Sequence, residues 1–136
     1  MKNVTLTLLA LLASLPAMAH QGHDHDAPTT LKAPKGGIIK ALDESRVEVV
    51  SRGKDLKVYV YDAAMKPASA ADFKIAASAE LPRTKKEETV PLWARKNHFE
   101  GSYDAKGAHR YTLKLKVTHA KTGHTDPLTF TIEPRK

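Results

Sequence analysis

The sequence predicts an all-β domain of antiparallel strands, and three observations support this fold class. Hydrophobic and polar side chains alternate over several stretches, most clearly in 110–118, where Tyr111, Leu113, Leu115 and Val117 would face inward. A period of two is typical of half-buried strands and differs from the period of an amphipathic helix. Turn-forming residues separate these stretches at short intervals, and no convincing amphipathic helix is found.

Four stretches show the clearest alternation, and each is predicted to form a strand with one face in the core. They are LKVYVYD (56–62), FKIAASAEL (73–81), HRYTLKLKVTH (109–119) and PLTFTIEP (127–134). Turns are expected at 43–45, 52–54, 65–67, 104–107 and 121–123, with a short helical turn at 69–72. Seven or eight strands in about a hundred residues suit an immunoglobulin-like antiparallel β-sandwich. A small barrel has the same periodicity and stays the alternative.

Residues 1–19 have the features of a secretory signal peptide. Lys2 provides positive charge, residues 4–15 are apolar, Pro16 follows them, and Ala17-Met18-Ala19 places small residues around a cleavage position. The apolar run is shorter than the ~20 residues that span a bilayer, so a membrane anchor is not expected. We expect cleavage after Ala19 and, for a bacterial leader of this type, a periplasmic protein without stable membrane insertion.

Cleavage leaves 117 of the 136 residues, which divide into a tail, 20–35, and a β-sandwich domain, 36–136. The tail is polar and rich in histidine, contains Pro28 and Pro34, and has the composition of a flexible segment. The chain has no cysteine, which excludes disulfides and thiolate ligands. Loss of Lys2 lowers the net charge from +7 to +6. Because the lysines are spread over the alternating stretches of an exported protein, nucleic acid is not expected as a partner.

No pattern typical of an enzyme is present. The sequence contains neither a nucleophile-elbow motif nor a glycine-rich phosphate-binding loop. Glu87 and Glu88 lie in a charged run, RTKKEET (83–89), which is typical of a solvated edge or turn. We therefore expect a binding protein and no enzymatic activity.

The stretch HQGHDHD (20–26) places three imidazoles and two carboxylates within seven positions. These candidate metal ligands are His20, His23, Asp24, His25 and Asp26. Short histidine-rich tracts with carboxylates suit borderline divalent metals. The alternative is a polar tail that contains histidines without binding metal.

The cleavage position decides which coordination chemistry this tail offers. A cut after Ala19 makes His20 the first residue, and its α-amine and Nδ1 then chelate one ion together. With a further histidine, this is the histidine-brace arrangement for copper. A cut two residues earlier gives Met18-Ala19-His20 and a histidine at position three, which is a different square-planar copper or nickel motif.

Two domain histidines, His119 and His124, flank the AKTG loop between two predicted strands. If that hairpin closes with the two residues paired, their Cβ atoms lie ~4.5–5.5 Å apart on one face. Asp126 lies two residues after His124 and is therefore expected on the same face of the strand. These residues form a candidate site of two imidazoles and one carboxylate. The alternative is a pair of rim histidines bonded to loop backbone. His109 lies ten residues from His119, roughly 33 Å at strand rise, and cannot share an ion with it.

The remaining residues narrow the choice of metal. The mature chain has one methionine, Met65, so a soft site for monovalent copper is not expected. Nitrogen and oxygen ligands suit Cu²⁺, Zn²⁺, Ni²⁺ or Co²⁺, and binding should weaken below about pH 6 as the imidazoles protonate. His98 is expected to be an exposed strand residue beside inward Phe99, and Trp93 is expected in the core.

The run APKGGIIKALDESRVEVVSRGKDLKVYVYDAAMKPAS (33–69) resembles a small periplasmic domain associated with heavy-metal efflux. Such domains occur in the adaptor subunits of resistance-nodulation-division metal pumps and as separate exported proteins. Pro34 with Gly36-Gly37, the strand RVEVV with Glu48, and the MKP turn carry the resemblance, and HFEGSYDAKGAHRYTLKLKV (98–117) is similar to the following hairpin. Relatives often have histidines where this chain has Lys35 and Arg46. The resemblance implies a β-sandwich and a partner in metal efflux more than it implies particular ligands.

These expectations combine into a periplasmic accessory protein that binds a divalent metal ion through its histidine-rich N-terminus. It would buffer the metal or deliver it to an efflux adaptor. The alternative is a non-metal interaction module of the cell envelope, which would use an exposed sheet edge or the pair Tyr59 and Tyr61.

Overall fold

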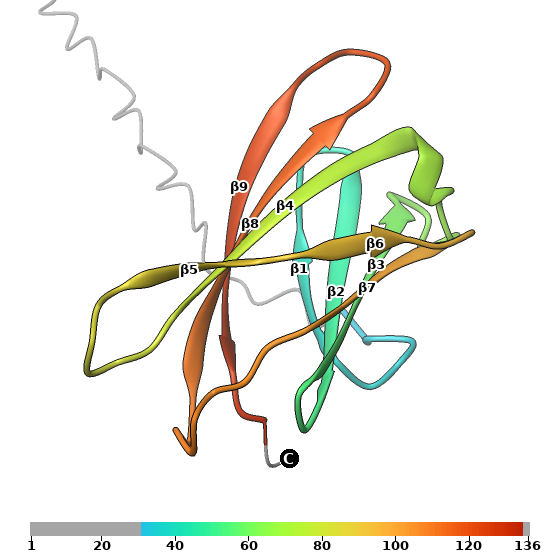
Figure 1. Ribbon diagram of the computed structural model, residues 1–136. Coiled ribbons are helices and arrows are strands. Elements are labelled where there is room, and N and C mark those ends of the chain that lie inside the picture. Colours follow the sequence, from blue (N-terminus) through green and yellow to red (C-terminus); the bar gives the residue numbers. More distant parts are fainter. Residues whose placement is uncertain (1–30, 135–136) are drawn as a thin grey trace, which may run out of the picture.

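The computed structural model describes residues 31–134, and in this range the chain forms nine β-strands and one short 3₁₀ helix. The strands make two antiparallel sheets in a β-sandwich-like arrangement (Figure 1), which confirms the predicted all-β class. Sheet A has the strand order β1-β2-β3-β7-β6, and sheet B has the order β5-β4-β8-β9. The predicted signal peptide and tail residues 20–30 lie outside the described residues.

The four stretches with the clearest alternation all form strands. Sheet A consists of β1 (Ile38–Ala41), β2 (Ser45–Arg52), β3 (Asp55–Asp62), β6 (Leu92–Ala94) and β7 (His98–Ser102). Sheet B consists of β4 (Phe73–Glu80), β5 (Glu87–Val90), β8 (Tyr111–His119) and β9 (Thr125–Ile132). The 3₁₀ helix η1 (Ala70–Asp72) precedes β4, and the hydroxyl of Ser69 accepts the N–H of Ala71 at its start. This confirms the helical turn expected at 69–72.

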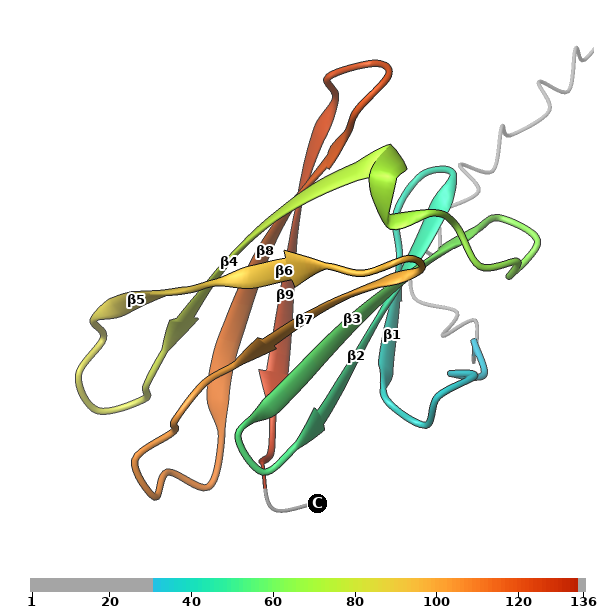
Figure 2. The same cartoon turned by 45° about the vertical axis from the view of Figure 1, so that its right-hand side comes forward.

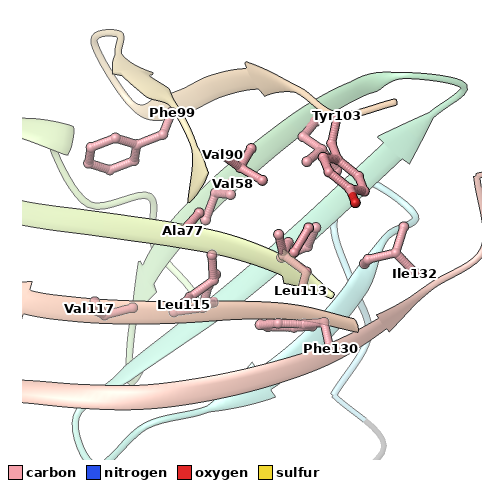
Figure 3. Packing of buried hydrophobic residues seen from close by; sticks show 14 of the residues in the cluster. Val58, Ala77, Val90, Phe99, Tyr103, Leu113, Leu115, Val117, Phe130 and Ile132 are labelled. Carbon is pink, nitrogen blue, oxygen red and sulfur yellow. The ribbon is translucent and has the colours of Figure 1, made fainter. Parts of the chain in front are cut away.

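The core lies between the two sheets and consists of the residues that the alternation places inward. On β8 the buried residues are Tyr111, Leu113, Leu115 and Val117, each no more than 1% exposed. Side chains from sheet A, Phe99 and Val58 among them, lie opposite those of sheet B in the core (Figure 3). Burying one such large apolar side chain stabilises the fold by about 1.5–3 kcal/mol. The period of two is therefore maintained by burial on a single face of each sheet.

Strands β5 and β6 belong to one extended segment that passes from sheet B to sheet A (Figures 1 and 2). Val90 still pairs with β4, whereas Leu92 already pairs with β7. Pro91 stands between them and has no N–H to donate, so it marks the end of the pairing with β4. This change of sheet divides one segment into two strands, and the described residues form nine strands where seven or eight were expected.

The two sheets do not close into a barrel. Among the described residues, each hydrogen-bonded pair of named strands lies within one sheet. The small-barrel alternative is therefore wrong, because the inner faces of two separate layers enclose the core.

Trp93 corrects another expectation. Its side chain was predicted to lie in the core, but the residue is 57% exposed. Leu92 supplies the half-buried side chain of this edge strand and packs against the core, which leaves Trp93 on the outer face of sheet A, opposite Glu100. The position of Trp93 in the alternating pattern of the strand therefore determined its orientation. The general tendency of tryptophan to be buried did not determine it.

Candidate functional site

The β8–β9 hairpin brings the two predicted domain histidines together. The N–H of His119 donates to the carbonyl of His124 at 2.9 Å, so the two residues face each other next to the turn. Gly123, at φ +71°, supplies the left-handed conformation that closes the loop. The Nε2 atom of His124 lies 3.0 Å from Oδ1 of Asp126. The predicted pairing of the histidines is confirmed, and one imidazole and one carboxylate are in contact.

The third member of this predicted set, His119, has different surroundings. Its ring packs edge-on against Phe73, its register partner on β4, with a centroid distance of 4.8 Å. The side chain of His124 is 63% exposed, whereas His119 is half-buried. Within residues 31–134, no group of three histidine, cysteine, aspartate or glutamate side chains is arranged to hold a metal ion. A site that combines His119, His124 and Asp126 therefore stays a prediction.

His98 lies on the outer face of sheet A, as the alternation predicts, but it is not an exposed residue. Its ring stacks on that of Tyr59 across β7 and β3, with a centroid distance of 5.1 Å and an interplanar angle of 24°. Its side chain is only 17% exposed. The expectation of an exposed His98 is wrong because Tyr59 covers one face of the imidazole.

Two basic groups hold the carboxylate next to this imidazole in its ionised form. Nε2 of His98 lies 2.9 Å from Oε1 of Glu100, and Nε of Arg95 lies 2.9 Å from Oε2. Hydrogen bonds from His98 and then Arg95 lower the pKa of Glu100 to about 2. Both oxygens of Glu100 are thus engaged by side chains of sheet A and its neighbouring loop.

A buried carboxylate anchors the residues just before β1. Glu48 points to the outer face of sheet A, yet it is 0% exposed. Its Oε1 accepts the N–H groups of Gly37 at 2.8 Å and Lys35 at 3.0 Å, and its Oε2 accepts the hydroxyl of Tyr61 at 2.7 Å. A buried charge without such donors costs several kcal/mol. We call residues 35–37, held in this way, the N-terminal latch.

Two glycines allow the latch to lie this close to β2. A Cβ atom on Gly37 would lie 2.2 Å from the carbonyl oxygen of Val49, so a larger residue requires the backbone to move. Gly36 has φ +75°, a conformation that favours glycine. The latch therefore explains why Gly36-Gly37 and Glu48 occur together in this sequence.

The latch also changes the expected role of Tyr61. Tyr61 and Tyr59 were considered as an exposed aromatic pair, but Tyr61 is 3% exposed and its hydroxyl is bonded to Glu48. Burial, followed by the hydrogen bond to Glu48, raises the pKa of Tyr61 above its ordinary value of 10. Tyr59 is half-buried, so the pair does not form one exposed contact surface.

Sequence reasoning did not identify Glu48 as a buried group, although a signal was present. A single carboxylate stands among valines in the strand RVEVV, eleven residues after the last glycine of PKGG. A side chain at an outward position on a strand is ordinarily solvated. Glu48 is buried only because residues 35–37 cover it. The other candidate ligands, His20, His23, Asp24, His25 and Asp26, lie outside the described residues, and His109 is exposed just before β8.

No protein-family model matches this chain, and no curated protein or solved structure matches it either. Among residues 31–134, no helix is long and apolar enough to cross a membrane.

Proposed function

We propose that this protein is a periplasmic accessory protein that binds a divalent metal ion, Cu²⁺, Zn²⁺, Ni²⁺ or Co²⁺. The observation that carries the proposal is the stretch HQGHDHD (20–26), which offers three imidazoles and two carboxylates in seven positions. No enzymatic activity is part of the proposal. The protein buffers the metal or delivers it to an efflux adaptor, in line with the resemblance carried by PKGG and RVEVV.

The β8–β9 hairpin supports the proposal as a secondary contribution. Nε2 of His124 and Oδ1 of Asp126 already lie 3.0 Å apart on an exposed turn. A metal ion that displaces the proton between them gains two ligands, and His119 stands opposite on the other strand. This pair is expected to bind more weakly than the tail.

The proposal also includes the finer fold class, an immunoglobulin-like sandwich. Two antiparallel sheets with a strand segment that changes sheet at Pro91 support it. The contact between the Gly36-Gly37 pair and Glu48 gives a common structural role to two motifs on which the efflux resemblance depends.

Titration calorimetry with each of the four metals tests this function. We expect the mature chain to bind clearly more tightly than millimolar at pH 7, and to lose affinity below about pH 6. Replacing His20, His23 and His25 by glutamine should remove most of the binding. The matched control is His109→Gln, which changes an exposed histidine outside the proposed ligands. Binding weaker than about millimolar by the unaltered mature chain for all four metals would refute the proposal.

The second candidate function, an envelope interaction module, is favoured by one observation. Trp93 is 57% exposed on an outer face that also carries Tyr59 and Arg95, and aromatic and arginine side chains are enriched at protein interfaces. A photo-crosslinking residue at position 93 discriminates the two functions. Crosslinking to one envelope protein, unchanged when the tail histidines are replaced and when metal is chelated, favours the interaction module.

A further inference from the structure

A basic groove lies on the outer face of sheet A beside the N-terminal latch. It has a volume of about 330 Å³ and is lined by Lys35, Val50, Arg52, Asp55, Lys57 and Tyr59. Three cationic side chains therefore face one carboxylate. Oε1 of Glu100 lies 3.9 Å from Nζ of Lys57, but both carboxylate oxygens of Glu100 are already engaged by His98 and Arg95. The groove consequently has an excess of positive charge that suits a segment with carboxylates.

The latch fixes where the preceding chain begins relative to this groove. The backbone N–H of Lys35 is bound to Glu48, and its ammonium lies 5.5 Å from the ring centroid of Tyr59, which lines the groove. The chain that precedes Lys35 is thus tethered at the wall of the groove. Tethering makes docking an intramolecular step, with an effective concentration in the millimolar range for short linkers.

The segment on the N-terminal side of this tether has the complementary charge. Residues 20–30 include Asp24 and Asp26 and contain no lysine or arginine. Asp26 precedes Lys35 by nine residues, which span at most ~32 Å when extended. Lys57 is two residues from Tyr59 on β3, roughly 7 Å along the strand, so both carboxylates can reach it.

We propose that, without metal, residues 20–30 dock in the basic groove through the carboxylates of Asp24 and Asp26, paired with Arg52, Lys57 and Lys35. The occupant is this chain's own tail and not a second copy or a separate anionic molecule. Because the same carboxylates belong to the metal ligands of the proposed function, on which this second step rests, metal binding and docking compete.

Amide chemical shifts of the full mature chain test the docking without metal. The protein is treated with a chelator and compared at low salt with Asp24→Asn/Asp26→Asn, which keeps the length of the tail and removes its negative charge. We expect the amides of Asp55, Lys57 and Tyr59 to differ between the two proteins. The difference should vanish at 1 M salt, where the Debye length falls to about 3 Å.

Two matched variants locate the docking surface. Arg52→Gln/Lys57→Gln should abolish the effect of the tail carboxylates on the β3 amides. Lys74→Gln/Lys116→Gln removes the same charge from the outer face of sheet B and should leave the effect intact. Identical β3 shifts with aspartate and asparagine tails would overturn docking. Shifts that grow with protein concentration would overturn it in favour of a second copy.

Zinc titration then tests the competition separately. Zn²⁺ should return the β3 amides of the mature chain to their positions in Asp24→Asn/Asp26→Asn. If half of the tails are docked, Arg52→Gln/Lys57→Gln should bind Zn²⁺ about twofold more tightly, because only undocked tails bind it. If the β3 amide shifts of the mature chain still differ from those of Asp24→Asn/Asp26→Asn at saturating zinc, metal binding and docking do not compete. Docking shifts in a protein that binds no metal would refute the proposed function and leave docking supported.

Discussion

Glu48 is a carboxylate buried on the outer side of a sheet, where a side chain is ordinarily solvated. The latch covers it and supplies two backbone N–H groups, while Tyr61 supplies a hydroxyl from the neighbouring strand. Hydrogen bonds to a charged group contribute about 1.5–3 kcal/mol each. The fold of the N-terminal edge of sheet A therefore depends on individual donors at this one residue.

The substitution Tyr61→Phe removes one of these donors and keeps the ring. We expect the free energy of unfolding, measured by urea denaturation, to fall by about 1.5–3 kcal/mol because Glu48 stays buried with one bond fewer. Tyr59→Phe on the same face of β3 is the control, and a change within about 0.5 kcal/mol is expected there. Equal losses in the two variants would contradict the role assigned to Tyr61.

Two buried tyrosines predict how stability depends on alkaline pH. Burial raises the pKa of Tyr111 to about 12, and Tyr61 is also raised above its ordinary pKa of 10. A group whose folded pKa is raised stabilises the fold fully below its unfolded pKa, and this contribution is lost as pH rises through the folded value. We therefore expect stability to fall from pH 10 towards about 12, and to fall less steeply in Tyr111→Phe. Denaturation measured at several pH values, with absorbance at 295 nm to follow phenolate formation, checks the sign.

At the scale of elements, strands β6 and β7 show how one sheet presents a core face and an exposed face side by side. Phe99 is 5% exposed between the two sheets, whereas Trp93, one strand away and opposite Glu100, is 57% exposed. The short β6 strand is an edge, and the segment that leads to it arrives from sheet B through Pro91. The alternation on each strand thus decides which aromatic residue contributes to stability.

This difference predicts opposite results for two aromatic substitutions. Phe99→Ala should lower the free energy of unfolding by about 3–5 kcal/mol through lost burial and a cavity. Trp93→Ala should change it by only about 0.5 kcal/mol because the indole is largely in solvent. Thermal and urea denaturation of both variants provide the measurement, and a large loss in Trp93→Ala would mean that the indole is covered in solution.

At the scale of the whole molecule, the candidate metal ligands of the tail precede the β-sandwich-like domain in sequence. The latch at 35–37 is bound to Glu48, whereas His20 to Asp26 precede it by at least nine residues. We therefore expect a chain that starts at Thr30 to keep the stability of the mature chain to within about 1 kcal/mol, since exposed ion pairs add little. Calorimetric unfolding of both chains in a chelator checks this, and a lower stability by several kcal/mol would place the tail within the fold.

The sequence alone determined the all-β class, the inward residues of β3, β4, β8 and β9, and the pairing of His119 with His124. Each of these follows from a period of two or from the length of one turn, which are local properties of the chain. The sequence also predicted a metal-binding tail, and that prediction awaits titration.

The tertiary structure decided what covers each outward side chain. The alternation placed Tyr61 and His98 outward and left Glu48 unassigned, whereas Trp93 was expected in the core. In the structure Glu48 and Tyr61 are buried, His98 is stacked on Tyr59 and Trp93 is exposed. The physical reason is that periodicity fixes the side of a sheet on which a residue lies, whereas its burial depends on segments distant in sequence. For Glu48 that segment is the latch eleven residues earlier, and its backbone N–H groups carry no signal in the side-chain pattern.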